Sequence, residues 1–397
     1  MEIKSNEEAI KDFNKELRRQ LDKHFSSLSK PIVKNIVEVV IALVGLLRTP
    51  RGWYGRMTLS GVARCMRTKG KTRIRYKRLD RFLRNGRFST SDTIVGLLHL
   101  TRGEKRNGLL PLLIDQTAIR DVQVISASFP YQGRSIPLAM ETFEHETIKF
   151  SQNKIEKGFF ARLQRTLGRD NVLLLIMDRG YAKVQYIFDF KQGPLYIIRG
   201  RREVKIEYWK GKKRKRIGLG RLPHGQGKAK SYRNVLYHGK RKVLVDVIVY
   251  RGKGFKEPWF LIVPPGKEEI LPTDEVVRWY RSRMNIEVKF RDFKSCLGVR
   301  GLKLEVRKAE KIGRLLVCLA IVYILLLVIG DSDLGKQLRK QIEVLRKRRR
   351  HGTRRTLSVL TIALFMATDS FLLTLSNLMK LLVSILSSST YGLCCLT

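Results

Sequence analysis

Cysteine is scarce in this sequence, and no two cysteines form a CxxC pair. The residues are Cys65, Cys296, Cys318, Cys394 and Cys395, an odd number scattered along the chain. This pattern excludes a disulfide framework of the kind found in small secreted proteins and indicates no cysteine-based zinc site. A reducing cytoplasmic compartment is the simplest interpretation.

Long hydrophobic runs are also few. The run Leu315 to Ile329 falls short of the roughly 20 residues that span a bilayer, so it predicts a buried core helix. The stretch Leu357 to Leu386 is apolar but interrupted by polar residues, which is typical of one or two amphipathic helices; a membrane hairpin is the alternative. The polar, acidic first residues do not resemble a signal peptide. We therefore expect no membrane partner.

Acidic residues are too few to balance the basic ones. The sequence has 35 Asp and Glu against 80 Lys and Arg, a net charge of +45. Folding does not require this excess, and its self-repulsion costs stability, so the charge predicts a polyanionic partner. Nucleic acid fits best, because each neutralised phosphate releases a counterion. An anionic membrane surface and the ribosome are the alternatives.

The remaining composition suits two or three folded domains. Apolar residues make up 43% of 397, enough for a proper core. The first hundred residues predict a helical region, with a basic run from Arg67 to Arg75 between two short helices. A helix-turn-helix type of DNA-binding domain is one interpretation, and a generic basic helical domain is the other. The expected helices are Glu7–His24, Ile32–Leu47, Thr58–Arg64 and Tyr76–Leu83.

Strands and helices alternate from about residue 109 onward. Three adjacent strands, two buried strands that follow, and helices between them predict an α/β fold with a mixed sheet. A β-rich segment follows, with a basic loop at Lys210–Arg216, and then a long helix at Asp274–Leu297. The expected strands are 109–115, 122–127, 136–140, 171–178, 194–199, 204–209, 243–250 and 259–263, and the helices between them are 151–167 and 182–191.

Two of the apolar strands run into an aspartate, Asp115 and Asp178. Strand carboxyl ends are where sheet proteins place functional groups. Two neighbouring carboxylates repel each other, and a divalent cation such as Mg²⁺ relieves that repulsion and can activate a nucleophile on a phosphodiester. Strand-end aspartates also cap turns or helices, and this second interpretation stays open for each residue alone.

The predicted helix at Asp274–Leu297 carries four polar residues on one face. At about 100° per residue, Tyr280, Arg283, Glu287 and Lys294 fall within an arc of about 60°. A neighbouring apolar stripe would dock this helix on the sheet; its members are Ile286, Phe290, Phe293 and Leu297. The face could bring Glu287 to a metal and the basic groups to DNA phosphates. A solvated helix with an Arg283–Glu287 ion pair explains the spacing equally well.

The same four residues resemble a family signature. The pattern Tyr280-x-x-Arg283-x-x-x-Glu287-x-x-x-x-x-x-Lys294 matches the Y-R-E-K signature of DDE transposases related to the IS4 group. The segment 286–294 resembles that family's "IE..FRD.K". Three more segments resemble family motifs: 114–117 the first aspartate motif, 133–138 the "GRAxPL" segment, and 178–181 the second aspartate motif. The resemblance covers about residues 75 to 330.

This resemblance implies an RNase H-like catalytic core, interrupted by a β-rich insertion, in which Asp115, Asp178 and Glu287 bind two Mg²⁺ or Mn²⁺ ions. It implies nicking of double-stranded DNA at the terminal inverted repeats of an insertion sequence, then attack of the 3′-OH on target DNA, commonly through a DNA hairpin. A homodimer would hold the two ends in the cytoplasm of a prokaryote, at the nucleoid. The implied DNA contacts are Tyr280, Arg283, Lys294, Trp259, Arg134 and Arg179.

For Trp259 the implied role is stacking on a flipped base, and ordinary core packing is the alternative. The sequence departs from the family pattern at Met284-Asn285, where many members have tryptophan, and at Gln116. The expected regions are 1–105 (helical, DNA-binding), 106–200 and 257–332 (the two parts of the core), 201–256 (the insertion) and 333–397 (a helical tail). A nuclease that cuts without joining and a non-catalytic DNA-binding protein are the competing functions.

Overall fold

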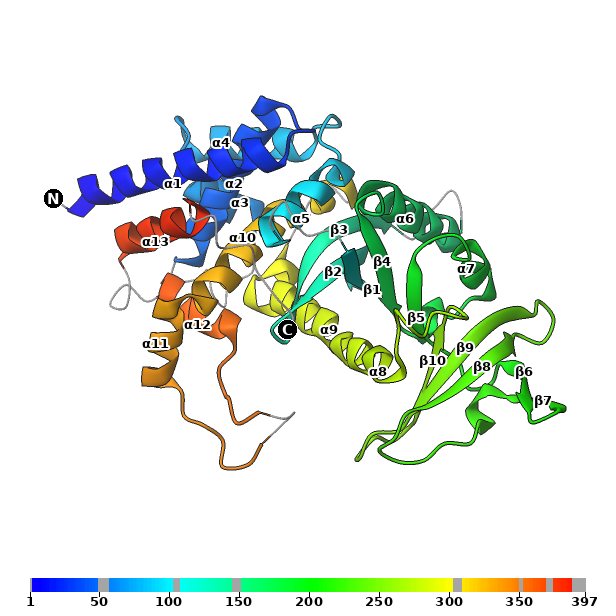
Figure 1. The fold of residues 1–397 in the computed structure, drawn as a ribbon. Helices are drawn as coiled ribbons and strands as arrows, with labels where there is room; N and C mark the ends of the chain where they lie inside the picture. Colours follow the sequence, from blue (N-terminus) through cyan, green and yellow to red (C-terminus); the bar gives the residue numbers. More distant parts are fainter. Residues whose placement is uncertain are drawn as a thin grey trace.

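The computed structural model describes residues 2–48, 57–102, 108–144, 151–302, 309–349, 353–368 and 374–387. Its centre is one ten-stranded mixed sheet flanked by helices (Figure 1). The strand order is β3-β2-β1-β4-β5-β10-β9-β8-β6-β7. The predicted α/β class with a mixed sheet is therefore confirmed.

The first half of the sheet comprises β1 (Gly108–Ile119), β2 (Val122–Tyr131), β3 (Arg134–Glu144), β4 (Asn171–Met177) and β5 (Leu195–Arg199). Strands β1, β2 and β3 form an antiparallel meander, whereas β4 runs parallel to both β1 and β5. The β2–β3 turn uses Gln132 and Gly133, both with positive φ, as a tight hairpin requires. These strands follow the predicted apolar runs, because runs of this kind are buried on both faces of a covered sheet.

One prediction about β1 was wrong. The strand does not end at Asp115 but continues for four more residues, to Ile119, paired with β2. What ends beside Asp115 is the parallel pairing with β4, whose last pair is Ile114 and Met177. Asp115 is therefore the first residue of β1 beyond its parallel neighbour.

The second half of the sheet is antiparallel. Strand β10 (Trp259–Val263) pairs with β5 and with β9 (Val243–Tyr250), and β8 (Lys230–Tyr237) pairs with β9 and β6 (Lys205–Lys210). The last strand, β7 (Lys213–Gly218), pairs with β6. The β-rich segment thus extends the central sheet through continuous hydrogen bonding and does not form a separate sheet.

Helices cover both faces of the central strands. Consecutive residues of β4 point to opposite faces of the sheet. Leu175 packs in the cluster that contains Phe160 of α6 (Gln152–Leu167), and Ile176 packs in the cluster that contains Val276 of α8 (Thr273–Ser282). Helix α7 (Val184–Asp189) lies on the α6 side, and α9 (Met284–Arg291) continues from α8 on the other. Asp178 follows β4 directly, so it emerges between these two helical layers.

The predicted single helix over 274–297 is divided in the structure. Helix α8 ends at Ser282, α9 begins at Met284, and a π-helical turn occupies Asp292–Cys296. The break is slight, because Arg283 keeps helical dihedral angles and its N–H bonds to the carbonyl of Tyr280. The π turn adds one residue to a helical turn, as the bond from the N–H of Leu297 to the carbonyl of Asp292 shows.

The first four N-terminal helices match the predicted ones closely, and the fifth, at Ile94–Arg102, was not predicted. They are α1 (Glu2–His24), α2 (Lys30–Leu47), α3 (Leu59–Cys65), α4 (Thr72–Leu83) and α5 (Ile94–Arg102), with a short 3₁₀ turn at Thr90–Thr93. They pack in one hydrophobic cluster with α10 (Ala309–Asp331) and one face of the sheet. Three helices complete the chain: α11 (Asp333–Ile342), α12 (Val359–Thr368) and α13 (Leu375–Ser387). The apolar C-terminal stretch, predicted to form one or two helices, contains α12 and α13.

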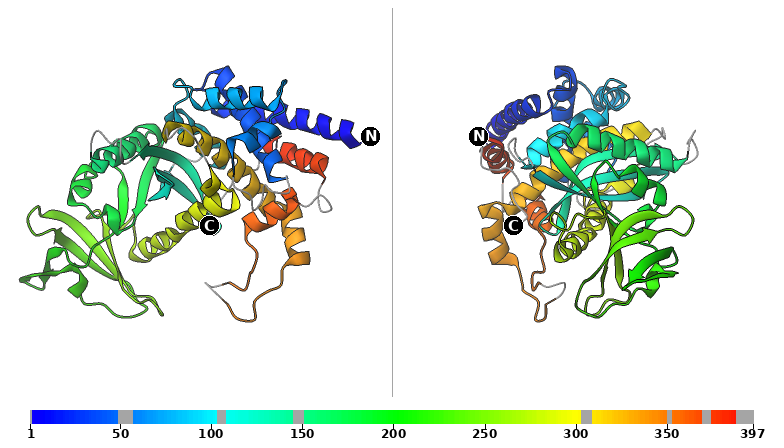
Figure 2. Two further views of the ribbon diagram at one scale, coloured as in Figure 1. Left: turned by 180° about the vertical axis from the view of Figure 1, so that it is seen from behind. Right: turned by 45° about the vertical axis from the view of Figure 1, so that its right-hand side comes forward.

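The two ends of the described chain meet. Helix α13 lies beside α1 in both views of Figure 2, and Gln20 donates a 2.6 Å hydrogen bond to the carbonyl of Leu386. Helix α10 is long and apolar enough to cross a membrane by length and composition alone. Its apolar window is wholly buried inside the protein, among the N-terminal helices, α12 and β3. The predicted core helix is therefore confirmed.

Candidate active site

The two predicted aspartates lie side by side at one edge of the sheet. Ile114 of β1 and Met177 of β4 are the last paired residues of adjacent parallel strands, and Asp115 and Asp178 follow them directly. Parallel strands end at the same edge, so the two carboxylates are neighbours although β1 itself runs on. Their mutual repulsion adds to the raised pKa of Asp115.

Arg283 joins Asp115 to Glu287. Its Nη1 lies 3.3 Å from Oδ2 of Asp115, and its Nη2 donates a hydrogen bond to Oε1 of Glu287. Arg283 is 7% exposed, whereas the Glu287 side chain is 46% exposed. The i, i+4 ion pair that offered an ordinary explanation of the spacing is therefore present. The same guanidinium also reaches a strand of the sheet, which a solvated helix face does not explain.

The other two residues of the helix face also reach the strand edge. The hydroxyl of Tyr280 donates to Oδ1 of Asp178 at 3.2 Å, and Nζ of Lys294 lies 2.6 Å from the hydroxyl of Thr117 in β1. Burial, followed by the charge of Asp178, raises the pKa of Tyr280, so its hydroxyl keeps its proton. Tyr280, Arg283 and Lys294 thus contact β1 or the residue that follows β4, even though the π turn changes the helical phase before Lys294. Glu287 is linked to Asp115 through Arg283.

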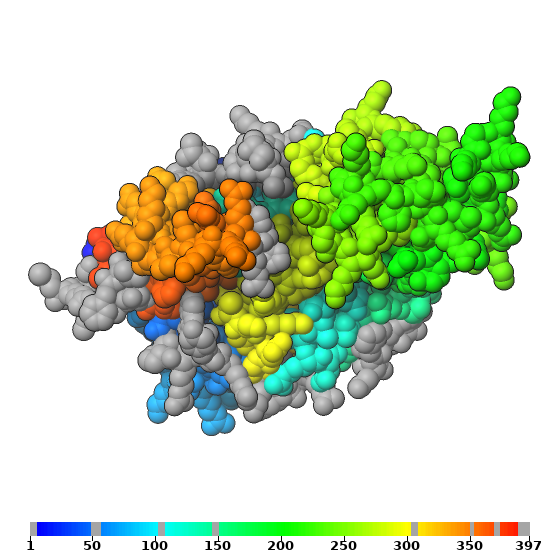
Figure 3. All heavy atoms as spheres, turned by 90° about the horizontal axis from the view of Figure 1, so that it is seen from below, coloured from blue at the N-terminus to red at the C-terminus, as the bar shows by residue number. Residues whose placement is uncertain are grey.

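The electrostatics of the site favour a cation. Burial raises the pKa of Asp115, and the charges of Asp178 and Glu287 raise it further, whereas the N–H of Gln116 and the guanidinium of Arg283 lower it. Burial and the two neighbouring carboxylates outweigh the guanidinium, so an added cation would stabilise the charged form of Asp115. Figure 3 shows this part of the surface: α8 and α9, in yellow, lie between the green strands of the second half-sheet and the orange C-terminal helices.

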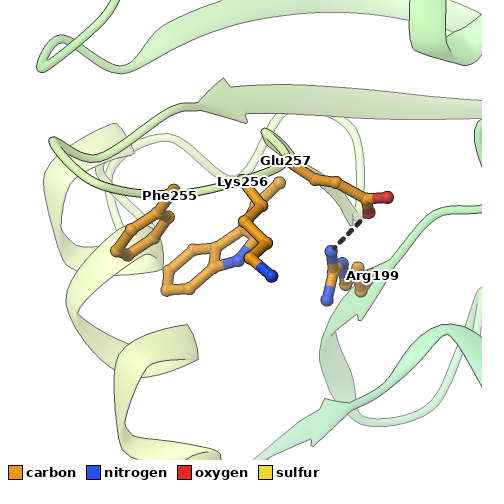
Figure 4. Close-up of a pocket in the computed structure, with 5 residues that line it drawn as sticks. Arg199, Phe255, Lys256 and Glu257 are labelled. Atoms are coloured by element: carbon orange, nitrogen blue, oxygen red, sulfur yellow. Dashed lines mark hydrogen bonds and ion pairs between the residues drawn. The ribbon is translucent and has the colours of Figure 1, made fainter.

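Trp259 belongs to an aromatic group next to Tyr280. Its ring centroid lies 4.9 Å from that of Tyr280 and 4.8 Å from that of Phe255, and Tyr250 lies beyond at 5.9 Å. Trp259 also lines an open pocket of about 330 Å³, together with Arg199, Phe255, Lys256 and Glu257 (Figure 4). Both packing and stacking therefore fit its position, since the indole touches neighbours and also borders open space.

Arginines gather around Glu257 at the rim of this pocket. The carboxylate of Glu257 lies 3.7 Å from the guanidinium of Arg179, 3.5 Å from that of Arg199 and 3.8 Å from that of Arg202. Arg179 directly follows Asp178, so this cluster borders the carboxylates. A phosphate could replace Glu257 as the partner of these guanidinium groups, of which those of Arg179 and Arg202 are half exposed. The DNA contact predicted for Arg179 stays a prediction, and its present partner is Glu257.

Arg134 has an internal partner. Its Nε lies 2.9 Å from Oδ2 of Asp292, which also accepts a hydrogen bond from the hydroxyl of Tyr323 at 2.9 Å. The Arg134 side chain is only 12% exposed. The DNA contact predicted for Arg134 is untested, but the geometry gives this residue a clear structural task. It ties the start of β3 to the π turn that follows α9.

Lys289 was not among the predicted site residues. It is 1% exposed, and its Nζ lies 2.7 Å from the hydroxyl of Ser126 and 3.1 Å from that of Ser128, both in β2. Ser126 pairs directly with Asp115. Burial lowers the pKa of Lys289 to about 7, and the charge of Asp115 opposes that shift. A lysine reads as a surface residue by its type, although this one lies three residues after Ile286 and four before Phe293, beside the predicted apolar stripe.

The three carboxylates are not gathered into a metal site in this structure. Within the described ranges, no group of three or more His, Cys, Asp or Glu side chains is close enough to hold a metal ion. The guanidinium of Arg283 lies between two of the three carboxylates. The donor set itself, carboxylate oxygen from three separate elements, suits Mg²⁺ or Mn²⁺. The residues therefore fit a divalent cation in type, provided that Arg283 moves.

Comparison with known proteins gives one family. Residues 151–325 match the family model described as "Transposase DDE domain". The matched part includes Asp178, Trp259, Tyr280, Arg283, Glu287 and Lys294 and begins after Asp115. No curated protein matches the chain. The family match supports a DDE transposase, an enzyme whose substrate is DNA and whose family generally uses a divalent metal.

Proposed function

We propose that this chain catalyses cut-and-paste transposition of an insertion sequence and belongs to the IS4-related group of DDE transposases. The reaction would hydrolyse phosphodiester bonds at the element's terminal inverted repeats and join the freed 3′-OH to target DNA. The observation that supports it is the convergence of Asp115 and Asp178, from adjacent parallel strands, with Glu287 through Arg283. The enzyme would work as a homodimer in a prokaryotic cytoplasm, at the nucleoid.

The proposed fold is an RNase H-like core with a β-rich insertion. The core would comprise 106–200 and 257–332, the insertion 201–256, and the flanking regions 1–105 and 333–397. Supporting features are the antiparallel meander β1–β3, the parallel pairing of β1 with β4 and of β4 with β5, and the site at their shared edge. The region 1–105 would bind the terminal repeats through its basic helices.

Asp115, Asp178 and Glu287 would hold two Mg²⁺ ions, which Mn²⁺ could replace, and these would activate the attacking oxygen and stabilise the leaving oxygen. The chain's own residues would position the DNA. Arg283 would exchange a carboxylate for a phosphate, to which a guanidinium can donate two parallel hydrogen bonds. Tyr280 would orient Asp178 through its hydrogen bond.

Three further groups would bind the strand on either side of the cut. Lys294 would neutralise a phosphate beside β1. The arginine cluster that includes Arg179 would bind a second phosphate in place of Glu257. Trp259 would stack on a base displaced from the duplex, because it borders the open pocket and is backed by Tyr280 and Phe255. Arg134 would act indirectly, by holding Asp292.

A reaction with the gene's own flanking DNA tests this proposal. The purified full-length chain would be incubated with Mg²⁺ and a plasmid that carries the gene between its native flanks, together with a second plasmid as target. We expect an excised fragment and joined products, both absent with Asp178→Asn although that variant still binds the plasmid. Cleavage without joined products would indicate a nuclease. DNA binding without cleavage by the unaltered chain would indicate a non-catalytic DNA-binding protein.

A further inference from the structure

The hairpin formed by β6 and β7 lies at the far end of the sheet from β3 (Figure 1). Strand β7 is last in the strand order and pairs with β6 from Lys205–Gly218 to Lys210–Lys213. Strand β6 pairs with β8 at Ile206 and Glu207. The hairpin beyond Glu207 therefore projects from the sheet as a two-stranded ribbon.

The ribbon is strongly basic on both faces. Its exposed cations are Lys210, Lys212, Lys213, Arg214, Lys215 and Arg216. Glu207 is the one acidic residue in the sequence of this hairpin, and it already has two partners, Arg214 and Lys242. The charge of Glu207 is thus neutralised within the protein. Because side chains alternate along a strand, Lys213 and Lys215 point to one face and Arg214 and Arg216 to the other.

Trp209 stands in the middle of these cations. It is 59% exposed, and it lies opposite Arg214 in the ladder. Its neighbours along β6 face inward: Ile206 and Tyr208 are buried, and the ring of Tyr208 packs against Tyr232 at 5.7 Å. Ile206 and Tyr208 therefore anchor the hairpin, whereas Trp209 is an exposed indole that the core does not use.

We infer that the β6–β7 hairpin is a second element that binds duplex DNA, away from the catalytic carboxylates. A two-stranded antiparallel ribbon is narrow enough to enter the major groove. Its lysines and arginines pair with phosphates on both sides of the groove, and Trp209 rests on sugar and base edges. The inference rests on the proposed function, because it assumes that DNA is the substrate. The positive charge on both faces favours DNA over a protein partner.

The salt dependence of DNA binding measures how many phosphate contacts the hairpin makes. The full-length chain would be titrated with a 40-base-pair duplex of random sequence at several salt concentrations. The variant Lys210→Gln/Lys212→Gln/Lys213→Gln removes three cations from the hairpin tip. Each lost phosphate contact lowers the slope of log K against log salt by about 0.9, so we expect a slope smaller by roughly 2.7.

A matched control removes the same charge from α6 and the end of α7, outside the hairpin. The variant Arg165→Gln/Arg169→Gln/Lys191→Gln changes three exposed residues near α6 and α7, and its slope should stay close to that of the unaltered chain. Trp209→Ala should weaken binding about tenfold with little change of slope, and Trp209→Phe should restore most of the affinity. Thermal unfolding of each variant checks that the fold is intact.

The outcomes distinguish the two proposals. If the unaltered chain does not bind the duplex, the proposed function fails. If it binds, and the hairpin variant keeps the slope and affinity of the control variant, the inference about the hairpin is overturned while the proposed function stands. A hairpin that serves a protein partner would give this second result.

Discussion

Nη1 of Arg283 lies 3.3 Å from Oδ2 of Asp115, a residue 168 positions earlier in the chain. The same guanidinium also binds Glu287, so one buried cation holds a strand and a helix together. Replacing it by Arg283→Ala leaves two carboxylates without their partner. We expect a lower free energy of unfolding, near the lower end of roughly 3–5 kcal/mol because Glu287 is half exposed.

A divalent cation should repair much of this loss. Mg²⁺ should raise the unfolding temperature of Arg283→Ala more than that of the unaltered chain, because the cation no longer competes with the guanidinium. Thermal unfolding with and without Mg²⁺ measures the difference. Asp115→Asn/Arg283→Ala is the control and should lose the extra Mg²⁺ response. Equal responses in all three proteins would contradict a metal site at these carboxylates.

Glu287 should matter for chemistry more than for DNA binding. Glu287→Gln keeps the size of the side chain and removes its charge, so a metal loses one ligand. Since a catalytic metal contributes several kcal/mol, cleavage should fall on the order of a thousandfold. Binding of the same DNA should change little, and a filter-binding or anisotropy assay measures it. Cleavage by Glu287→Gln at the unaltered rate would remove Glu287 from the catalytic set.

Trp259 should report on a displaced base. With a duplex that carries 2-aminopurine next to the cut, stacking on the indole should quench the fluorescence of that base. Trp259→Ala should abolish the quenching and weaken binding by about 1–3 kcal/mol, and Trp259→Phe should retain part of both effects. Quenching that survives in Trp259→Ala would mean that the indole only packs against Tyr280 and Phe255.

Lys289 should make stability depend on pH. Its pKa is about 7 in the folded protein and 10.5 for an ordinary lysine. Between these values the unfolded chain binds a proton that the folded chain does not, so the free energy of unfolding rises with pH through this window. Lys289→Met lacks the amine, and Ser126 and Ser128, whose hydroxyls lie 3.2 Å apart, can satisfy each other.

The test is the difference in free energy of unfolding between the unaltered chain and Lys289→Met, measured as a function of pH. The stability of the unaltered chain relative to Lys289→Met should increase by up to about 1.4 kcal/mol per pH unit between pH 7 and pH 10. Below pH 7 the difference should level off, with the variant at its greatest relative advantage. Urea unfolding at several pH values measures it. Parallel pH profiles would show that Lys289 is charged in the folded protein throughout.

Gly330 should be irreplaceable in the packing of α10 on α12. A Cβ at this position would lie 2.2 Å from the carbonyl oxygen of Val359, and a backbone atom cannot easily move away. Gly330→Ala should destabilise the protein by about 1–3 kcal/mol. The control is Gly158→Ala in α6, where a Cβ would have nothing within 4 Å. There alanine lowers the conformational entropy of the unfolded chain, so the variant should be more stable by roughly 0.5–1 kcal/mol. Thermal unfolding compares the two.

The sequence predicted those features whose signal is local. The apolar run before Asp178 determines a buried strand, and the spacing of Tyr280, Arg283 and Glu287 determines a common face, because both depend on periodicity over a few residues. The end of β1 was misplaced, because the strand's last residues are held by β2 and not by their own hydrophobicity. Their pairing is visible only once the hairpin has formed.

Contacts across long intervals were beyond prediction from residue patterns. Arg134 and Asp292 each belong to a recognisable motif, yet only the structure shows that they form an ion pair and so explains both motifs together. The helix is divided at Arg283 and has a π turn at Asp292–Cys296. Both features follow from tertiary packing, which helical periodicity does not report. The burial of Lys289 beside Ser126 has the same origin.

The continuous sheet fixes the distance between the catalytic carboxylates and the basic hairpin. Six steps in the strand order separate β4, which precedes Asp178, from β7. At about 4.8 Å per step this is roughly 29 Å, the length of about nine base pairs. A basic ribbon fixed at that distance would meet the duplex within one helical turn of the cut. Adding two strands to the sheet would move this contact by about three base pairs, so strand number would set the length of DNA that the enzyme measures.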